Sequence, residues 1–384
     1  SVFTSQNSFK GTPGGNINIV YADDMTRNLM QDFGADMDNY SQQYNFDYKL
    51  DFEKEGHNIE FEADYNTFDA DEDTFFDFTG ATPLPDYEDF VDTKRDRTTL
   101  NLDYVNPLSE SEKLEVGLQA ILFNTDIGYS STGQSFNAEG NLAPTPNTLF
   151  DYSRDIYSAY VTYGKNYEKW SYQAGVRAEQ VNVAADTNSV RAFTNDYFEL
   201  YPSAYVTFNP SEKNQYQVSY SRRIDRPGVG QVNPIREWSS PLVTQYGNVN
   251  LRPQFTNSLE ANYTRSLDKG SITAGVFYRI IEDQINQAVY VDRFNLDRMV
   301  LTNDNFDSTT AYGFEVSANY KPTEWWSLNA SFDLFSQTQT GISESLDPDI
   351  ENPTAADIML TEREVTNSIF NPRIINNFTA TQRL

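Results

Sequence analysis

Cysteine is absent from this sequence, and histidine occurs once, at His57. Without cysteine there is neither a disulfide framework nor a thiolate metal site, and one histidine does not make a histidine-based catalytic triad or cluster. No stretch approaches 18 consecutive apolar residues, which excludes a transmembrane helix. Basic residues are scarce as well, because 28 Lys and Arg accompany 56 Asp and Glu for a net charge of −28. Nucleic acid is therefore not expected as a partner, since phosphate binding needs clustered basic residues.

Aromatic residues, by contrast, are abundant. The 25 Tyr and 26 Phe bring the aromatic share to 14%, yet the mean hydropathy is −0.62. Alternation explains both values: in residues 312–320 and 326–334 every second position is apolar, and Gly, Ser, Asn, Asp or Glu fill the others. A period of two predicts β-strands with one apolar face. The same pattern recurs in residues 44–52, 59–65, 100–104, 114–118, 170–176, 216–220, 259–263 and 272–278.

The connections between these strands alternate in length. Short polar turns are predicted near residues 54–57, 106–113, 165–168, 209–214, 266–270 and 321–324. Long segments are predicted near residues 69–94, 125–153, 184–196, 225–254, 285–309 and 339–363. This rhythm is typical of an outer-membrane barrel with short periplasmic turns and long extracellular loops; a soluble β-sandwich, the alternative, has similar turns at both ends. The sequence thus favours an all-β fold, a transmembrane antiparallel β-barrel, located in the bacterial outer membrane.

Two tryptophans support the membrane assignment. Trp170 and Trp326 each lie on an apolar strand face just after a short turn. Outer-membrane barrels carry aromatic girdles at the membrane interface, so we expect both residues in the periplasmic girdle. Ordinary core tryptophans are the alternative.

The strand count indicates an internal portion of a larger barrel. Six short turns join twelve strands, and residues from about 364 add another, which makes about 13 strands. Residues 1–41 are predicted to form an extracellular loop or irregular segment, and residues 42–384 the barrel portion. On this count, an ascending strand, that is, one that runs from a short turn toward the long loops, is missing before Ser1. A plug domain and both barrel ends are not expected within these residues.

One stretch of the acidic chain is locally basic: "SYSRRIDRPGVGQVNPIREWSSPL", residues 219–242. Arg222 continues the apolar, lipid-facing phase of its strand. Because arginine on a lipid face costs ~2–4 kcal/mol near the bilayer midplane, we expect Arg222 at or beyond the outer interface. Arg223 continues the lumen-facing phase. We expect Arg223 and Arg226 to pair with acidic groups of loops or plug and to pin residues 225–254 over the barrel mouth. Contact with lipopolysaccharide or nearby Asp and Glu is the alternative.

The same region carries a family resemblance. The stretches "YPSAYVTFNPSEKNQYQVSYSRRIDRP" (201–227), "NPI" (233–235) and "YGNVNLRPQFTNSLEANYTR" (246–265) resemble the outer-membrane β-barrel family of TonB-dependent receptors from Bacteroidota-type bacteria. The hairpin 312–335 resembles the next hairpin of that family, whereas Val249 and Gln254 depart from its motif. The matching positions that serve as the family signature are Arg222, Arg223, Arg226, Pro227, Asn233, Pro234, Gly247, Asn248, Leu251 and Pro253.

The resemblance implies a TonB-dependent receptor, that is, energised nutrient uptake through a plugged barrel. The TonB complex would then be a partner, provided that a plug and a TonB box exist outside these residues. Two other functions stay open: a structural or accessory subunit of a larger outer-membrane complex, with other outer-membrane proteins or lipoproteins as partners, and a passive porin. Outer-membrane lipid and lipopolysaccharide are expected to surround the barrel in each case.

The remaining question is whether the sequence contains a metal site or catalytic residues. In residues 69–92, Asp69, Asp71 and Asp73 have the spacing of a calcium loop, but Thr74 and Gly80 occupy positions where an EF-hand needs Gly and Glu. A looser divalent-cation site and a solvated loop both stay open, and no metal site is assigned. No Gly-rich phosphate loop opens a helix, and no catalytic carboxylate pair stands out. The sequence therefore predicts no enzyme and no cofactor.

Overall fold

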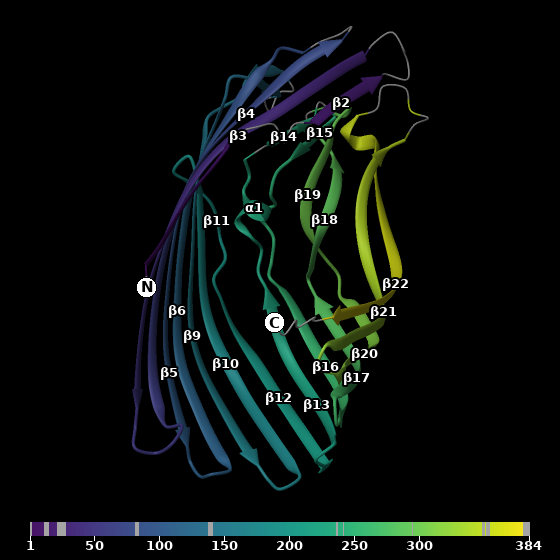
Figure 1. Cartoon of the computed structure of the whole chain (residues 1–384). Coiled ribbons are helices and arrows are strands. Elements are labelled where there is room, and N and C mark those ends of the chain that lie inside the picture. Colours follow the sequence, from purple (N-terminus) through teal and green to yellow (C-terminus); the bar gives the residue numbers. More distant parts are fainter. Residues whose placement is uncertain are drawn as a thin grey trace, which may run out of the picture.

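The computed structural model describes residues 2–10, 15–20, 28–80, 84–136, 141–235, 237–240, 242–293, 295–347, 350 and 354–378. These residues are almost entirely β-strand, and most of the strands belong to one large, mainly antiparallel sheet that curls around a central space (Figure 1). The predicted all-β barrel wall is thereby confirmed.

The wall consists of long strands joined in sequence order, with shorter elements at its edges and inside it. The wall strands are β3 (Asn28–Asp51), β4 (Asn58–Gly80), β5 (Tyr87–Pro107), β6 (Glu112–Ser131), β9 (Thr148–Asn166), β10 (Trp170–Thr187), β12 (Tyr197–Ser211), β13 (Asn214–Asp225), β16 (Gln254–Leu267), β17 (Gly270–Glu282), β20 (Thr309–Thr323), β21 (Trp326–Leu346) and β22 (Ile358–Phe378). The shorter strands are β1 (Val2–Lys10), β2 (Gly15–Val20), β7 (Gln134–Phe136), β8 (Leu142–Pro144), β11 (Val190–Thr194), β14 (Glu237–Ser240), β15 (Val243–Gln245), β18 (Gln284–Val291) and β19 (Met299–Phe306). The helices are α1 (Val229–Val232) and the 3-10 turn η1 (Ala355–Asp357). Among the described residues, no helix has the length and apolarity needed to cross a membrane.

The six short turns predicted from the sequence are confirmed. Each joins two paired wall strands, as between β3 and β4, where the amide of Phe52 donates to the carbonyl of His57 at 2.8 Å. Gly56 in this turn has a φ of 75°, which glycine adopts without the strain that a side chain would cause. The short turns lie together at the lower end of the wall in Figure 1, which we call the short-turn end. The opposite end is the long-loop end.

The wall strands continue into several of the segments that the sequence analysis assigned to long loops. β4 and β5 stay paired as far as Phe76 and Tyr87, so most of residues 69–94 form a hairpin. The β6–β9 and β21–β22 hairpins are extended in the same way. The loop prediction is wrong here because the acidic residues belong to a strand, in which they alternate with Phe76 and Phe78, both buried on the other face.

The prediction that residues 1–41 form a loop or irregular segment is also wrong for the residues that the structure describes. β1 pairs with residues 36–44 of β3, and β2 pairs with residues 28–33 of the same strand. Together β1 and β2 fill the strand position next to β3, for which a strand before Ser1 was expected. The strand signal was missed because "GTPGG", residues 11–15, separates two short runs, and Pro and Gly usually mark a break. The location of this segment outside the cell stays a prediction.

The two sheet edges are formed by β1 with β2 and by β22. β1 and β2 pair with β3, and β22 pairs with β21. In the described ranges no strand pairing joins one edge to the other, so the wall is an open curl (Figure 1). An open curl of this kind fits the predicted portion of a larger barrel.

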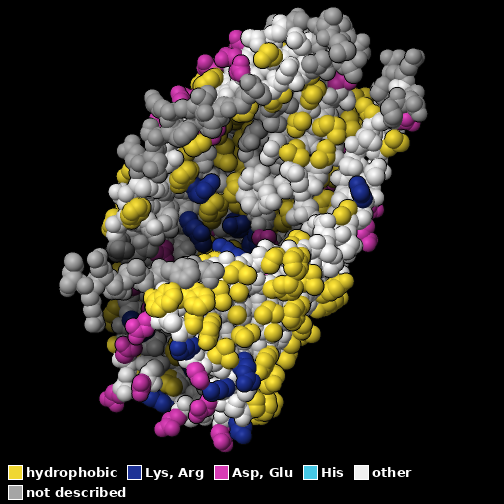
Figure 2. All heavy atoms as spheres, turned by 45° about the vertical axis from the view of Figure 1, so that its right-hand side comes forward, with side chains coloured by type: hydrophobic (Ala, Val, Ile, Leu, Met, Phe, Trp, Pro, Cys, Tyr) yellow, Lys and Arg dark blue, Asp and Glu magenta, His cyan; other side chains and the backbone are white. Residues whose placement is uncertain are grey.

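Apolar side chains cover the convex face of the wall. Phe46 and Val276, for example, are 58% and 52% exposed, although they lie on strands of a large sheet. Figure 2 shows such side chains as a band over one side of the molecule, with charged side chains below it. Exposed apolar surface of this extent marks a surface that is covered by another apolar medium. In an outer-membrane barrel that medium is lipid.

The concave face carries the main buried cluster, toward the long-loop end. Its wall residues come from β6, β9 and β10, and they include Phe150 and Val181, both 0% exposed. The segment between β13 and β16 contributes Val232, Ile235 and Leu251 to the same cluster. This segment therefore folds onto the inner wall and does not extend away from it, which brings the family signature into the lumen.

Candidate functional site

The candidate site is the segment 226–253, which we call the crossbar. It contains α1, β14 and β15, and Figure 1 shows α1 inside the curl of the wall. On one side, Val232, Ile235 and Leu251 pack into the buried cluster of β6, β9 and β10. The contiguous apolar contact explains why a loop rich in polar residues settles against the wall.

Backbone hydrogen bonds tie the two halves of the crossbar together. The amide of Gly247 donates to the carbonyl of Asn233 at 2.7 Å, and the amide of Asn248 donates to the carbonyl of Gln231 at 2.7 Å. A Cβ on Gly247 would lie 2.6 Å from the backbone nitrogen of Asn233. Glycine is therefore required here by close backbone approach, which accounts for its place in the signature.

On its other side, the crossbar is bound to the β18–β19 hairpin. The Asn248 side-chain amide donates to the carbonyl of Asn303 at 3.1 Å. The backbone amide of Arg252 donates to Oδ1 of Asn305 at 2.7 Å, and Nδ2 of Asn305 donates back to the carbonyl of Arg252 at 2.9 Å. The crossbar thus joins two regions that are far apart in the sheet.

The remaining signature residues of the crossbar shape its path. Asn233 is buried, and its Oδ1 accepts the amide of Ile235 at 3.1 Å, which caps the turn after α1. Pro234 is half-buried, and Pro253 is buried beside Leu251 just before β16 begins. Pro227 accepts, through its carbonyl, a hydrogen bond from Arg154 of β9 at 3.4 Å. The signature positions within the crossbar therefore form one connected structural unit.

The β18–β19 hairpin is itself held to the wall by an ion pair. Arg293, which follows β18, donates from two nitrogens to the two carboxylate oxygens of Glu344 on β21, at 2.6 Å and 2.7 Å. The amide of Val291 donates to the same carboxylate at 3.1 Å. These hydrogen bonds, that of Arg293 first, lower the pKa of Glu344, whose position near the end of β21 lies beyond the apolar band.

The three signature arginines have different environments. Arg226 forms an ion pair with Glu179 of β10, and its Nε donates to the hydroxyl of Tyr197 at 3.1 Å. Arg222 lies 3.3 Å from Oε2 of Glu199, and its guanidinium carbon is 4.6 Å from the ring centroid of Phe255. Arg223 is exposed, and the described residues include no ion pair for it.

This arrangement differs from the expectation for Arg223. We expected Arg223 on the lumen face to carry an acidic pair, whereas the pair with a wall carboxylate belongs to Arg222. The location of Arg222 at the outer interface stays a prediction. β13 parts from β12 after the pair of Ser203 and Ser221, but it stays paired with β16 as far as Asp225, so its alternation continues through both arginines. On the unpaired β12 side, the Arg222 side chain reaches Glu199. For Arg226, the acidic partner is on the wall itself.

A hydrogen-bonded chain extends from Arg226 across the inner wall, and no pattern in the sequence predicted it. Glu179 also accepts from Nε of Arg177 at 2.7 Å, and Arg177 donates to Gln119 at 2.5 Å. Gln119 in turn donates to Asn101 at 2.7 Å, and Asn101 to Glu62 at 3.2 Å. These residues come from four different wall strands, so only their lateral register could have revealed the chain.

Trp170 and Trp326 both lie at the short-turn end of the wall, and their place in a membrane-interface girdle stays a prediction. Trp170 is 49% exposed and stacks on Phe208 at 4.3 Å between ring centroids. The row continues through Tyr216, which stacks on Tyr263 at 4.8 Å. Trp326 begins β21 directly after the last short turn. The aromatic partners were not singled out from the sequence, because neighbours across strands depend on register.

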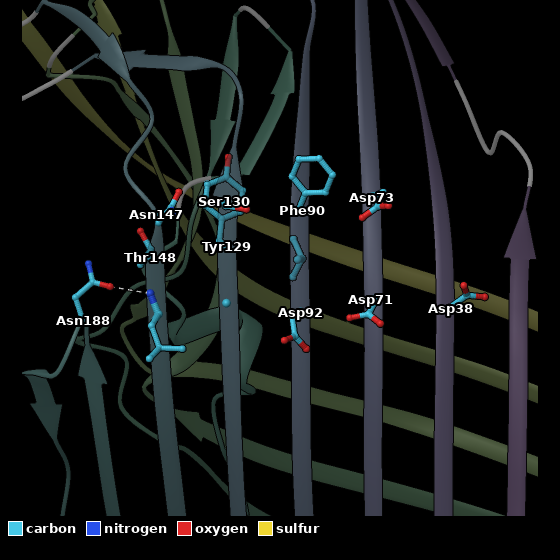
Figure 3. A pocket seen from close by; sticks show the side chains of 13 residues that line it. Asp38, Asp71, Asp73, Phe90, Asp92, Tyr129, Ser130, Asn147, Thr148 and Asn188 are labelled. Atoms are coloured by element: carbon cyan, nitrogen blue, oxygen red, sulfur yellow. Dashed lines mark hydrogen bonds between the residues drawn. The ribbon is translucent and has the colours of Figure 1, made fainter.

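The acidic segment 69–92 contributes to a hollow of about 680 Å³ on the outer face of the wall. Figure 3 shows Asp38, Asp71 and Asp92 side by side on β3, β4 and β5, in one cross-strand row. Gly128 of β6 continues that row without a side chain, which leaves the space beside Asp92 open. In the part of the chain that the structure describes, no group of three or more Asp, Glu, His or Cys is placed to hold a metal ion.

Comparisons with known proteins agree with this architecture. The family model described as "Outer membrane protein beta-barrel family" matches residues 50–382. Among solved structures, the chain is similar to the copper transporter OprC, with a TM-score of 0.56 and 13% identity over 85% of this chain and 55% of that one. It is also similar to the hemophore receptor HasR of Serratia marcescens, with a TM-score of 0.58 and 13% identity over 86% of this chain and 54% of that one. The chain thus spans about half the length of each. No curated protein sequence matches it.

Proposed function

The chain belongs to the outer membrane protein beta-barrel family, and we propose that it forms the main wall of a TonB-dependent receptor for energised uptake of a solute. The observation that carries the proposal is the crossbar. It is fixed to the β9–β10 wall through Arg226 and the buried cluster, and to the β18–β19 hairpin through Asn248 and Arg252. A barrel with an element tied across its interior suits a gated path better than an open one.

The polar inner wall supports the same proposal. Hydrogen-bonding side chains run from Glu62 to Arg226 across the lumen face, while apolar side chains cover the convex face. Such a wall can offer a solute polar contacts inside a lipid bilayer. The similar structures are named as a transporter and a receptor, which supports a function in binding and passage of a solute. These structures are not named as enzymes.

The proposed partners follow from the proposed function. The TonB complex would supply the energy, acting on a plug domain outside these residues. The long-loop end would face outside the cell, among lipopolysaccharide, and the short-turn end would face the periplasm. Other outer-membrane proteins or lipoproteins are partners only if the barrel is a subunit of a larger assembly.

Two measurements on the full-length protein test this function. The first is co-purification with TonB after cross-linking in cells, and the second is arabinose permeation into liposomes that contain the protein. We expect TonB to be captured and arabinose to be excluded. Arabinose entry without TonB capture would identify a passive porin. Exclusion of arabinose without TonB, with stable co-purification of other outer-membrane proteins, would identify a structural subunit.

A further inference from the structure

An arginine patch lies on the lumen face of the wall, next to the crossbar. It consists of Arg95 and Arg97 of β5 and Arg154 of β9, with Phe123 of β6 between the two strands. Arg97 is paired in register with Phe123, and Phe123 with Arg154, so these side chains share one cross-strand row. Phe123 packs against the buried inner cluster, which places the row on the concave face. Figure 2 shows Lys and Arg side chains gathered in the hollow of the molecule.

The arginines are arranged around aromatic rings. The guanidinium carbon of Arg95 lies 5.3 Å from the ring centroid of Phe68 and 5.9 Å from that of Phe123. The guanidinium carbon of Arg154 lies 5.6 Å from the same Phe123 centroid. A guanidinium over a ring is held in position by its flat face, and its N–H groups remain available at the edge. The patch is therefore pre-organised for hydrogen bonding.

The donors of the patch lack carboxylate partners among the described residues. Arg95 and Arg97 are exposed to the lumen and form no ion pair there. Nε of Arg154 is buried without a hydrogen-bond partner, although another of its nitrogens donates to the carbonyl of Pro227. A buried donor without a partner is costly, so it marks a place where an acceptor would be stabilising.

Nearby carboxylates are already engaged or face the other way. Glu179 is bound by both Arg177 and Arg226. Asp64, one row nearer the short-turn end, is bound by the side chain of Asn45. Asp96 lies between Arg95 and Arg97 in sequence but belongs to the outer face, where the hydroxyl of Tyr65 donates to it at 2.9 Å. The patch is thus an uncompensated positive region inside a chain of net charge −28.

We propose that the arginine patch binds a solute with two or more anionic groups of the carboxylate or phosphate type. Two anionic groups are required because Arg97 and Arg154 are two strand spacings apart, roughly 9–10 Å. Planar guanidinium groups suit both carboxylate and phosphate, with which they form paired hydrogen bonds. This inference rests on the proposed function, since it names the class of solute that the receptor would admit past the crossbar.

The test uses the full-length protein in a non-ionic detergent at low ionic strength, with citrate and pyrophosphate as probes in titration calorimetry. We expect both to bind, acetate to bind much more weakly, and added salt to weaken binding. The double variant Arg95→Gln, Arg97→Gln should lower citrate affinity by at least roughly 10- to 150-fold, as expected for the loss of one charge-assisted hydrogen bond. Arg191→Gln is the matched control, because Arg191 pairs with Asp186 on the outer face at 3.1 Å and should leave affinity unchanged.

Folding of each variant is checked by heat-dependent gel mobility. A second double variant, Arg95→Lys with Arg97→Lys, keeps the positive charge and should retain part of the citrate affinity. Absence of citrate and pyrophosphate binding by the unaltered protein would overturn the inference, as would equal affinity in the Gln variant. Citrate binding by a protein that admits arabinose and does not capture TonB would support the arginine site and reject the energised receptor. TonB capture and arabinose exclusion, with citrate affinity unaffected in the Gln variant, would reject the arginine site alone.

Discussion

Removal of Arg226 should loosen the crossbar without disturbing the barrel wall. The Arg226 side chain is 19% exposed, and that of its partner Glu179 is 7% exposed, so the pair is largely out of water. Loss of one partner of a buried pair costs roughly 3–5 kcal/mol when the other charge is left alone. Here Glu179 keeps its 2.7 Å hydrogen bond with Arg177, so it is not left alone. A smaller cost of about 1.5–3 kcal/mol, that of one charge-assisted hydrogen bond, is therefore expected for Arg226→Ala.

Amide hydrogen exchange measures this cost where it acts. The amides of Gly247 and Asn248 are protected by hydrogen bonds inside the crossbar, so their exchange reports its opening. A loss of 1.5–3 kcal/mol corresponds to exchange that is roughly 10 to 150 times faster. The amide of Ser219, in the paired centre of β13, should exchange at its original rate.

Arg223→Ala is the matched control for Arg226→Ala. Arg223 lies three residues away, carries the same charge and is exposed, with no ion pair among the described residues. Its removal should leave the exchange of Gly247 and Asn248 unchanged. Equal exchange in Arg226→Ala and the unaltered protein would refute the reasoning, because the ion pair would then not hold the crossbar. Equal acceleration by both variants would show that only the local charge matters.

Three further predictions concern packing, membrane contact and pH. Gly247→Ala should open the crossbar at a cost of roughly 1–3 kcal/mol, because its Cβ has no room, and chymotrypsin should then cut the crossbar faster than in the unaltered protein. Val316→Arg, on the apolar face of β20, should impair membrane assembly by ~2–4 kcal/mol near the midplane, whereas Ser317→Arg on the lumen face should assemble, as read by heat-dependent gel mobility. Because the pKa of Glu344 is lowered from its usual 4.5, the contribution of its pair with Arg293 is fully present above that pH and is lost as the pH falls through the lowered value. Exchange of the Val291 amide should accelerate in that acidic range in the unaltered protein, and this acid-induced acceleration should be absent in Glu344→Gln.

Much of the wall could be predicted from the sequence, because a strand with one apolar face carries its period in its own residues. The alternation in residues 312–320 and 326–334 predicted β20 and β21, and the polar residues between them predicted their turn. The length of the strands was underestimated in residues 69–92, because a row of aspartates looks like a loop unless the buried Phe76 and Phe78 on the other face are given weight.

The sequence alone determined that the chain is a β-wall with an apolar outer face and a signature segment between β13 and β16. It could not determine where that segment goes, because its path depends on contacts with distant strands. Only the tertiary structure places Arg226 against Glu179, Asn248 against Asn303, and Arg97 in the same row as Arg154. Local periodicity fixes which face a side chain occupies, whereas register and curvature fix which neighbours it meets, and those are properties of the assembled sheet.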